Sequence, residues 1–579
     1  MSSSGQENTP AVQATQALHA GQTVQAGQTV QAPQTTQAGQ AVQTAQATQP
    51  PQAGQTVQAG QAPQVGQAGE VGQATQVAQA VQAVPAAQAA QAAQAAQAAQ
   101  APEAAGAAGA VGVGGEAGFG AEALEGLRRR VRGPVLTPGD EHYDAERAGA
   151  QTVRAHRPSI LVGATGPADV MAAVEFAGRH GLAVAVQGTG HALGAVAGEG
   201  GVLINTSRMT GVRVDAAAGT AWVAAGVSWD RVIHEAAPAG LAPLAGSAPS
   251  VGVVSYTLGG GLGLLSRRYG YAADRVRSID VVTADGRLRH VTAASEPDLF
   301  WALRGGRDNF GVVTGLEIEL MPVAALYGGG LFFDFASARE VLGAYVRWSA
   351  GMPEEMTSSV AVISFPDLPV LPPPLRGRHV LHVRIAYAAD DLGAGKELVA
   401  PLRALGPFND TVRELSCAEV GTVHNDPTAP GTFESGTAML GALDDGAVQA
   451  LLDHVGPHTP VPHVVELRHL GGRLARPADV PNAVGNRDAH YLLSVVSRLE
   501  RAPLTGIRPA HERLLAALGP WSTGGRALTF LNGERDAEHV RSAYEPDDYR
   551  RLTEIKAAHD PQNLFRLNHN IPPATPGQH

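Results

Sequence analysis

Residues 184 to 191 form a short β-branched run that opens into a glycine-punctuated loop and ends on a histidine: Val-Ala-Val-Gln-Gly-Thr-Gly-His. A strand that enters such a loop presents backbone amides and one side chain, here His191, to a bound cofactor. The alternative for the same residues is a strand followed by a tight turn with a solvated histidine. Sequence farther along the chain decides between the two.

A second glycine-rich segment lies at residues 246 to 263, where five glycines fall among residues 252 to 263. Backbone without Cβ atoms lets amides approach a ring or a pyrophosphate closely, which favours a ligand-binding role; a plain glycine-rich turn is the alternative. A third segment, residues 298 to 314, has the pattern of a helix that ends at Gly305-Gly306 and is followed by a β-branched strand.

The elements before His191 predict how it is positioned. Residues 157 to 162 have the pattern of a strand, and Pro167 opens a helix whose apolar positions recur at helical spacing up to Gly181. The strand at residues 184 to 187 follows directly. This strand–helix–strand unit, with its glycine loop at the far end, is a common architecture for holding a nucleotide.

Taken together, the three segments resemble the flavin-dependent oxidoreductases of the vanillyl-alcohol oxidase superfamily, and specifically the berberine-bridge-enzyme-like branch with a PCMH-type FAD-binding domain. The resemblance covers residues 125 to 323. It resumes at Tyr549 and runs to Asn-Leu-Phe-Arg-Leu-Asn-His-Asn-Ile-Pro-Pro at residues 563 to 573. It implies an FAD-dependent oxidoreductase, and no nicotinamide-type Gly-x-Gly-x-x-Gly fingerprint is seen.

The resemblance also implies where FAD lies. Residues 187 to 192 supply amides to the pyrophosphate, residues 246 to 261 contact the isoalloxazine ring, and a ring nitrogen of His191 is joined to the 8α-methyl carbon of the flavin. That bond requires a neutral imidazole nucleophile, and it raises the reduction potential of the flavin. The cofactor-binding residues implied in this way are His191, Gln187, Gly188, Thr189, Gly190, Ala192, Gly246, Ser247, Val251, Gly252, Ser255, Tyr256, Gly260, Gly261, Gly311, Val313, Asn568 and Asn570.

The chain departs from the family pattern at several positions. Ala248 occupies the place where many members carry a second tether, a cysteine, so attachment through two residues is excluded. Thr189, Val254 and Ser255 stand where the family commonly has glycine, but none of these changes removes an amide. The resemblance therefore leaves His191 as the one covalent anchor at the two attachment positions of the family.

The catalytic base does not follow from the resemblance. The family often carries a Tyr-x-Asn motif whose tyrosine removes the substrate proton, and the corresponding residues here are Phe530-Leu531-Asn532. A phenyl ring cannot accept a proton, so the base lies elsewhere or the reaction differs from simple alcohol oxidation. The candidates are Tyr491, His490 and Tyr256. For Tyr491 the alternative is a packed residue at the start of a strand.

Residues 324 to 525 alternate apolar runs with helical stretches, a pattern that suits an antiparallel sheet covered by helices. In the resembling family this part covers the flavin and selects the substrate. The predicted fold class is therefore α+β: a two-part PCMH-type FAD-binding domain and an antiparallel-sheet substrate domain covered by helices. The predicted divisions are a disordered Gln/Ala-rich leader (1–120), the FAD-binding domain (121–323), the substrate domain (324–525) and a segment that returns to the FAD domain (526–579).

Composition limits the partners. The net charge is −11, and the six Glu of residues 1 to 127, which contain no Asp, Lys or Arg, leave the rest of the chain at −5. A nearly neutral folded part argues against nucleic acid or an anionic membrane as the main partner. Cys417, the only cysteine, excludes intrachain disulfides and Cys-based clusters, and no metal-ligand set stands out. Without a secretory signal or a long apolar run, a cytoplasmic location is predicted; no oligomeric state is.

Three functions are compatible with these observations. The first is an oxidase or dehydrogenase with a covalently bound flavin that acts on a hydroxyl- or amine-bearing carbon of a small organic molecule, with O₂ as acceptor. The second is a flavin-dependent cyclase or desaturase in secondary metabolism, which Phe530 favours. The third is a flavin-binding protein without turnover.

Overall fold

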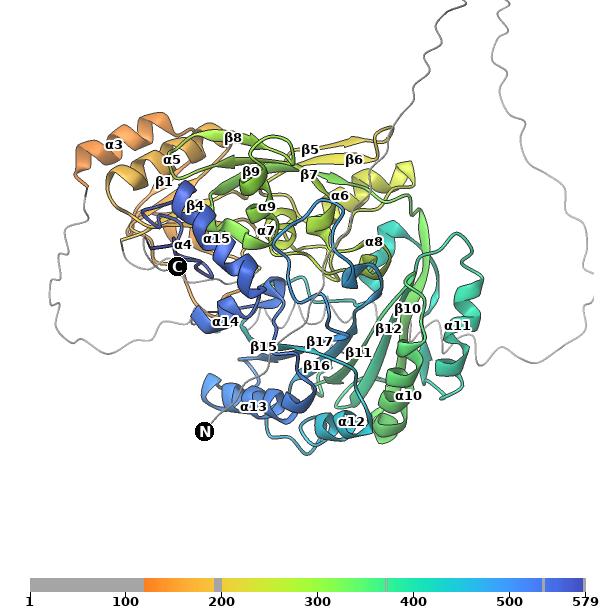
Figure 1. Ribbon diagram of the computed structural model, residues 1–579. Helices are drawn as coiled ribbons and strands as arrows, with labels where there is room; N and C mark the ends of the chain where they lie inside the picture. The colour runs from red at the N-terminus through yellow and green to blue at the C-terminus, as the bar shows by residue number, and fades with distance from the viewer. Residues whose placement is uncertain (1–118, 192–199, 370, 372, 534–536, 576–579) are drawn as a thin grey trace, which may run out of the picture. The chain divides into compact units, whose positions relative to one another are not determined.

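The structure is a computed structural model that describes residues 119–191, 200–369, 371, 373–533 and 537–575 (Figure 1). The predicted leader, residues 1 to 120, therefore lies outside the described residues except for its last two. Ala192, one of the predicted cofactor residues, also lies outside them. Within the described ranges, the structure contains no helix that combines the length and the apolar character of a membrane span.

A four-stranded sheet carries His191 just beyond one of its strands. Its order is β1-β2-β4-β3, and β2, β4 and β3 run parallel. Pro167 begins the helix between β2 and β3, and Asp169 in its first turn accepts from the amides of Arg132 and Thr165 at 2.9 and 2.8 Å. The elements are α3 (Ala121–Arg130), β1 (Val135–Leu136), α4 (Tyr143–Arg147), β2 (Ile160–Gly163), α5 (Pro167–Arg179), β3 (Val184–Gln187) and β4 (Val202–Asn205).

A five-stranded antiparallel sheet of order β5-β6-β9-β7-β8 follows. Part of the predicted loop at residues 246 to 261 is helical, because Val253–Leu258 form α7. The elements are β5 (Val212–Asp215), β6 (Thr220–Ala224), α6 (Trp229–Ala236), α7 (Val253–Leu258), α8 (Ser266–Tyr269), β7 (Val276–Val282), β8 (Leu288–Val291), α9 (Pro297–Gly306) and β9 (Val312–Glu319).

The carboxyl-terminal segment packs against these first two sheets. The amide of Val184 donates to the carbonyl of Leu564 at 2.9 Å, and the Lys556 ammonium donates to the carbonyl of Asn309 at 2.6 Å. Figure 1 shows α15 beside elements from the first half of the described chain. The helices of this segment are α14 (Ala537–Arg541) and α15 (Pro546–His559). Leu552, Phe565 and Ile571 join the core of the first two sheets.

The third sheet is antiparallel and has the order β13-β10-β12-β11-β16-β17-β15, with β14 also paired to β10. Helices α10, α12 and α13 lie along one of its faces (Figure 1), and their apolar residues share a core with the strands. The elements are β10 (Ala325–Asp334), α10 (Ala338–Ala350), β11 (Met356–Ser364), β12 (His379–Tyr387), α11 (Ala394–Arg403), β13 (Asn409–Asp410), β14 (Arg413–Ser416), β15 (Phe433–Leu440), α12 (Asp445–Leu452), β16 (Val464–His469), β17 (Tyr491–Arg498) and α13 (Leu504–Ala517).

The register of the third sheet gathers polar side chains in rows on its other face. Because successive side chains of a strand point to opposite faces, Leu381, Val383 and Leu467 enter the helix-covered core, and their neighbours point away from it. One row of cross-strand partners consists of Phe332, His382, Ala361, Glu466, Ser494 and Thr437. The next row consists of Gly330, Arg384, Ser359 and Arg468.

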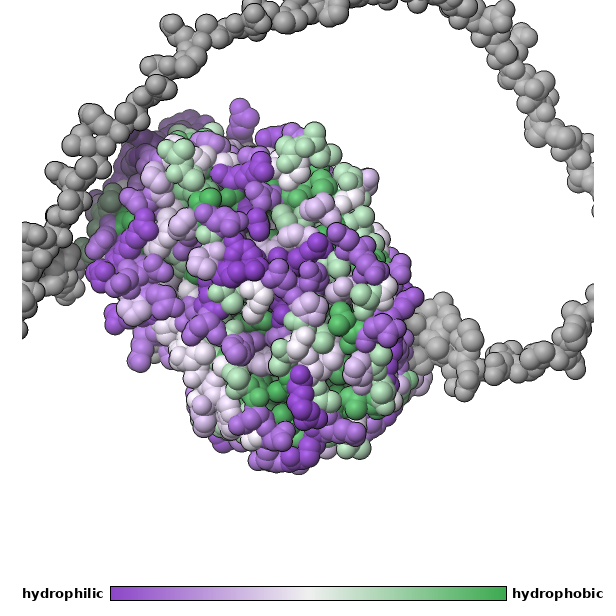
Figure 2. Space-filling model, turned by 45° about the vertical axis from the view of Figure 1, so that its right-hand side comes forward, coloured by the Kyte–Doolittle hydropathy of each residue, from purple (hydrophilic) through white to green (hydrophobic). Residues whose placement is uncertain are grey.

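Figure 2 shows one face of the outer surface coloured by hydropathy. On that face hydrophilic and hydrophobic residues are interspersed. The large apolar side chains exposed among the described residues are Leu288, Phe408 and Val480, which lie far apart in the sequence. Scattered apolar residues of this kind are normal for a protein surface. The interior face of the third sheet is therefore the more informative place to look for a site.

Candidate active site

A cavity of about 1160 Å³ lies between the loops of the first two sheets and the polar face of the third. Pockets for single small ligands typically measure roughly 300–1,000 Å³, so this one has room for a dinucleotide cofactor and a small substrate together. The predicted cofactor residues that line it are Gln187, Gly188, Thr189, Gly190, His191, Gly246, Ser247, Val251, Gly252, Ser255, Tyr256, Gly311, Val313 and Asn568.

The loop after β3 offers free backbone donors to this cavity. Among the described residues, the amides of residues 188 to 191 donate no hydrogen bond, while the carbonyls of Thr189 and Gly190 accept from the amides of Ala150 and Gln151 at 3.0 and 2.9 Å. Gly190 has a φ of +65°, and a Cβ on it would lie 2.5 Å from the Cα of Gly149. Close packing against residues 149 to 151 therefore requires glycine at 190 and fixes the loop with its amides unused.

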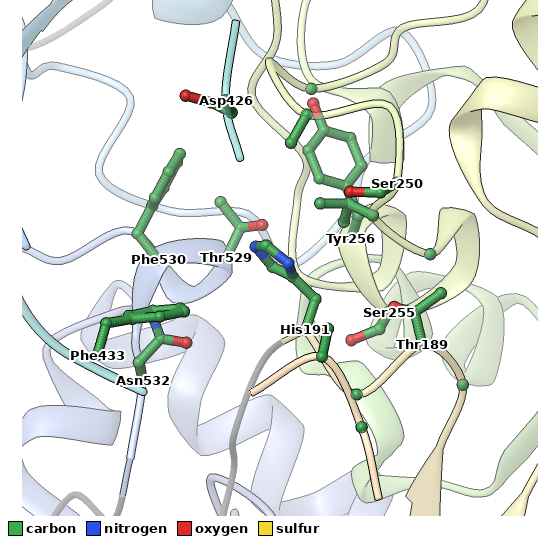
Figure 3. Close-up of a pocket in the computed structure, with 18 of the residues that line it drawn as sticks. Thr189, His191, Ser250, Ser255, Tyr256, Asp426, Phe433, Thr529, Phe530 and Asn532 are labelled. Carbon is green, nitrogen blue, oxygen red and sulfur yellow. The ribbon is translucent and has the colours of Figure 1, made fainter. Parts of the chain in front are cut away.

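His191 lies half-buried at the wall of the cavity, with Thr529 and Phe530 across from it (Figure 3). Its ring centroid is 6.4 Å from that of Phe433. Burial lowers the pKa of His191 below its ordinary value, and the carboxylate of Asp426 opposes this shift. The imidazole is therefore neutral at neutral pH, the form that a nucleophile must have.

Tyr256, on α7, lines the cavity, but its surroundings make it a poor base. Its ring packs edge-to-face on Trp229 with centroids 5.4 Å apart, and a Cβ on Gly246 would lie 2.9 Å from the ring. The hydroxyl is buried without a hydrogen-bond partner, and burial raises its pKa far above the ordinary value. The phenol therefore stays protonated, and proton abstraction by Tyr256 is disfavoured.

The structure corrects the other two candidates for the base. Tyr491 points into the helix-covered core, where its hydroxyl lies 2.7 Å from Oγ of Ser349 on α10. His490 is exposed, and its amide donates to the carbonyl of Leu440 at 2.8 Å. Neither residue lines the cavity. Alternation along β17 explains the error, because Leu492 and Ser494 lie on the opposite face from Tyr491.

Three predicted cofactor residues, Gly260, Gly261 and Asn570, do not line the cavity. Gly260 and Gly261 have φ of +108° and +77° in the turn after α7. A Cβ on Gly261 would lie 2.6 Å from the ring of Tyr256, so this glycine makes room for the tyrosine. Asn570 precedes Ile571, whose amide donates to Oδ1 of Asn309 at 2.8 Å inside the core.

Sequence reasoning missed an ionic cluster at the centre of the sheet wall. Both carboxylate oxygens of Glu466 are bonded: Oε1 accepts from Nη1 of Arg384 at 2.7 Å and from Oγ of Ser359 at 2.7 Å, and Oε2 accepts from Nε of Arg468 at 2.9 Å. Nε2 of His424 lies 3.3 Å from Oε1. All of these residues except Ser359 line the cavity.

The cluster fixes the protonation state of its carboxylate. Burial alone would raise the pKa of Glu466, but Arg468, Arg384 and His424 outweigh it and hold that pKa well below its ordinary range. Burial and Arg384 lower the pKa of His424, and Glu466 and Asp426 oppose the shift without cancelling it. Glu466 is therefore an anion and His424 is neutral at neutral pH.

An apolar group lies at the other end of the same wall. The ring of Phe332 stacks on that of His382 with centroids 4.0 Å apart and planes at 13°. Gly330 makes this possible, since a Cβ there would lie 2.1 Å from Nε2 of His382. Phe365, Ile363 and Leu375 complete the apolar end of the cavity lining.

The lining fits FAD. The free amides at residues 188 to 191 suit a pyrophosphate, which binds backbone donors. The lining also holds buried polar atoms without partners, Oη of Tyr256, Nε of Arg307 and Oδ1 of Asn568, which a ligand with donors and acceptors along its length can satisfy. Within the described ranges, no group of three or more His, Cys, Asp or Glu side chains is placed to hold a metal ion. The fold and site together define the class of FAD-dependent oxidoreductases.

Comparison with known proteins identifies the family. The model of the FAD binding domain matches residues 158–292, and that of the berberine and berberine like domain matches residues 526–572. The chain is 29% identical over 466 residues to (R)-6-hydroxynicotine oxidase of Paenarthrobacter nicotinovorans, covering 76% of this chain and 97% of that one. It is 24% identical over 484 residues to chitooligosaccharide oxidase of Gibberella zeae, covering 78% and 94%. The crystal structure of 6-hydroxy-D-nicotine oxidase from Arthrobacter nicotinovorans matches with a TM-score of 0.67 and 26% identity, covering 77% of this chain and 98% of that one.

The chain therefore contains an FAD binding domain and a berberine and berberine like domain, and it is similar to FAD-linked oxidases over about three quarters of its length. The predicted family, the fold class, the FAD cofactor and the oxidoreductase activity are confirmed by these matches.

Proposed function

We propose that this protein carries FAD bound covalently through His191 alone, and that it oxidises a hydroxyl- or amine-bearing carbon of a small organic molecule with O₂ as the final electron acceptor. One observation carries the proposal: one cavity joins the free amides and His191 of the loop after β3 to the polar face of the third sheet. A cofactor and a substrate that share this cavity lie against each other.

Bound FAD would supply the acceptor for a hydride, and the protein supplies the rest. The amides of residues 188 to 191 would hold the pyrophosphate, and the neutral ring of His191 supplies the nucleophile for the covalent bond. The polar rows of the third sheet orient the substrate.

The names of the relatives support a small polar substrate. One acts on 6-hydroxynicotine and another on chitooligosaccharides. A cavity that is polar at its centre and apolar at one end can hold a hydroxylated or amino-substituted ring. We therefore expect oxygen consumption with at least one member of a panel that contains 6-hydroxynicotine, chitooligosaccharides and other small alcohols and amines, with bleaching of the yellow protein by the same compound without air.

The covalent bond is tested separately. FAD fluorescence should stay with the polypeptide after acid precipitation, and His191→Ala should release the flavin into the supernatant. The matched control is His234→Ala, which removes an exposed histidine of α6 outside the cavity. Flavin that washes out of the wild-type precipitate contradicts attachment through His191.

A flavin-dependent cyclase or desaturase is a second candidate, because Phe530 lines the cavity where the family often places its catalytic tyrosine. Such a reaction uses the same hydride acceptor but yields a ring closure or a carbon–carbon double bond. Mass and NMR analysis of the product separates the two candidates. A yellow protein that no member of the panel bleaches favours flavin binding without turnover.

A further inference from the structure

His424 combines deep burial with unused bonding capacity. It follows a short 3-10 turn (Cys417–Thr422), is 7% exposed, and lines the cavity on the side of the third sheet. Its Nε2 lies 3.3 Å from Oε1 of Glu466, and its Nδ1 has no hydrogen-bond partner. A buried polar atom without a partner is unusual and calls for a functional explanation. A neutral imidazole with a free Nδ1 inside a cavity can accept a proton from a ligand.

The neighbouring carboxylate, that of Glu466, is not itself a suitable proton acceptor. Glu466 already accepts hydrogen bonds from Ser359, Arg384 and Arg468 at 2.7 to 2.9 Å. Such charge-assisted bonds stabilise the anion and make it a weak proton acceptor. Its remaining contact is Nε2 of His424 at 3.3 Å, so its effect falls on the histidine.

The charges around His424 suit an imidazolium that forms during reaction. Glu466 and Asp426 attract a proton on the ring, and Arg384 repels it; Arg468 lies on the far side of Glu466. His382 is neutral, because its burial lowers its pKa well below the ordinary value, and its Nδ1 accepts from Nε of Arg384. The carboxylates of Glu466 and Asp426 balance the charges of Arg384 and Arg468. Protonation of His424 therefore adds one positive charge beside two anions.

The other groups that line this part of the cavity are poorer acceptors. Tyr256 is held as a protonated phenol, and Phe530, whose ring lies under the guanidinium of Arg468 at 5.0 Å, has no acceptor at all. Asp426 is half-exposed at the cavity wall. Water can reach this carboxylate, whereas His424 is buried inside the cavity.

We propose that His424 is the catalytic base of this enzyme and that Glu466 is the positioning residue that orients it and stabilises its protonated form. The inference rests on the proposed function. The O–H or N–H bond of the substrate breaks and its proton joins a ring nitrogen of His424. The adjacent C–H bond breaks and a C=O or C=N bond forms; bound FAD would supply the acceptor for the hydride. The two electrons pass to O₂, which becomes H₂O₂ by taking up the hydrogen of the C–H bond and the proton that His424 releases.

The first test uses 4-nitrophenol as a probe, because its ionised form absorbs at longer wavelength than its neutral form. In the flavin-loaded protein, the bound probe should ionise at a lower pH in wild type than in His424→Gln, because only the wild type offers an acceptor for its proton. His424→Gln should bind the probe, as measured by equilibrium dialysis, without the ionised absorbance at that lower pH. His463→Gln is the matched control, because His463 is also a buried histidine with an unpartnered Nδ1, and it lies outside the cavity.

Two outcomes overturn the proposal: wild-type protein that never ionises the probe, and ionisation that sets in at the same pH in His424→Gln. Neither depends on turnover, so failure here is distinct from failure of the proposed oxidation. That oxidation fails instead when the flavin is never bleached. His424→Asn replaces His424→Gln if the latter does not load flavin.

The second test is the pH profile of flavin reduction by the compound that the substrate panel identifies. Activity should fall as the pH drops through the pKa of His424, because the protonated ring cannot accept a proton. We call this fall in activity at low pH the acid limb of the profile. Glu466→Gln removes a charge that raises the pKa of His424, so the acid limb should move to lower pH. Arg384→Met removes a charge that lowers the same pKa, so the acid limb should move to higher pH. His424→Gln should slow reduction by about 10²-fold or more and lose the limb. Limbs that stay in place, or shift together in one direction, contradict the assignment.

Discussion

The two walls of the cavity are built in different ways. The cofactor wall uses backbone from two short continuous stretches, residues 187–191 and 246–252, whose amides and glycines do the binding. The substrate wall uses side chains, one from each of several neighbouring strands at the same level of the sheet. Changes in the first wall should therefore remove FAD, and changes in the second should leave FAD in place and alter stability or turnover.

The largest effect is expected at Gly190. Gly190→Val places a β-branched residue at a φ of +65° and a Cβ 2.5 Å from the Cα of Gly149. Backbone strain of this kind costs about 1–3 kcal/mol before the clash is added, and the loop must move. We expect purified protein without flavin, measured by the ratio of flavin to protein absorbance. Gly181→Val is the control, because Gly181 has a φ of +64° but open space around it. Equal flavin content in the two variants would contradict the role given to the cofactor wall.

Glu466→Ala should come second. It leaves two buried guanidiniums without their shared carboxylate, and breaking a buried ion pair costs about 3–5 kcal/mol. We expect a lower free energy of unfolding in denaturant with flavin still bound to the folded fraction. Glu235→Ala is the control, because Glu235 and its partner Arg231 on α6 are both exposed, and such a pair contributes about 0–1 kcal/mol. Similar losses in both variants would count against a buried ionic centre.

The same carboxylate predicts a dependence of stability on pH. The pKa of Glu466 is lower in the folded protein than in the unfolded chain. Its contribution is therefore fully present above the unfolded value, about 4.3, and is lost as the pH falls below it. Glu466→Gln should show a shallower loss of stability than wild type over that acid range, measured as the denaturant midpoint against pH. Parallel curves would show that the cluster does not hold the carboxylate ionised.

A smaller effect is expected at the apolar end of the substrate wall. Phe332→Leu removes the stack on His382, and aromatic pairs contribute about 0.5–1.5 kcal/mol. We expect a modest fall in Tm, normal flavin content and a higher KM for ring-bearing substrates in oxygen-consumption assays. An unchanged KM together with a lower Tm would restrict Phe332 to a packing role.

The smallest effect is expected from Phe530→Tyr. The new hydroxyl restores the family's usual residue type beside Arg468, and the ring can keep its place under that guanidinium. Flavin content and Tm should stay close to wild type, with a change in stability within about 0.5 kcal/mol. If His424 is the base, the acid limb of the pH profile should not move. A limb that moves in this variant would show that residue 530 can take over proton removal.

The contrast between the walls also explains what the sequence could predict. The glycine loop ending in His191 is continuous in the sequence, and together with the other two segments it carries the family resemblance that implied the cofactor residues, most of which line the cavity. Glu466 and Arg468 alternate along β16, which indicates a polar strand face, but their partners Arg384 and His424 lie far away in the sequence. The register of the sheet brings Arg384 to Glu466, and the loop after Thr422 brings His424 to them. The face on which Tyr491 lies was likewise set by register and could not be read from its motif.

Peptide mapping of the denatured protein by mass spectrometry tests the central claim most directly. The account predicts that the mass of FAD is carried by the peptide that contains His191 and by no other peptide. A polypeptide free of flavin, or flavin on a different peptide, would contradict the assignment of the cofactor wall.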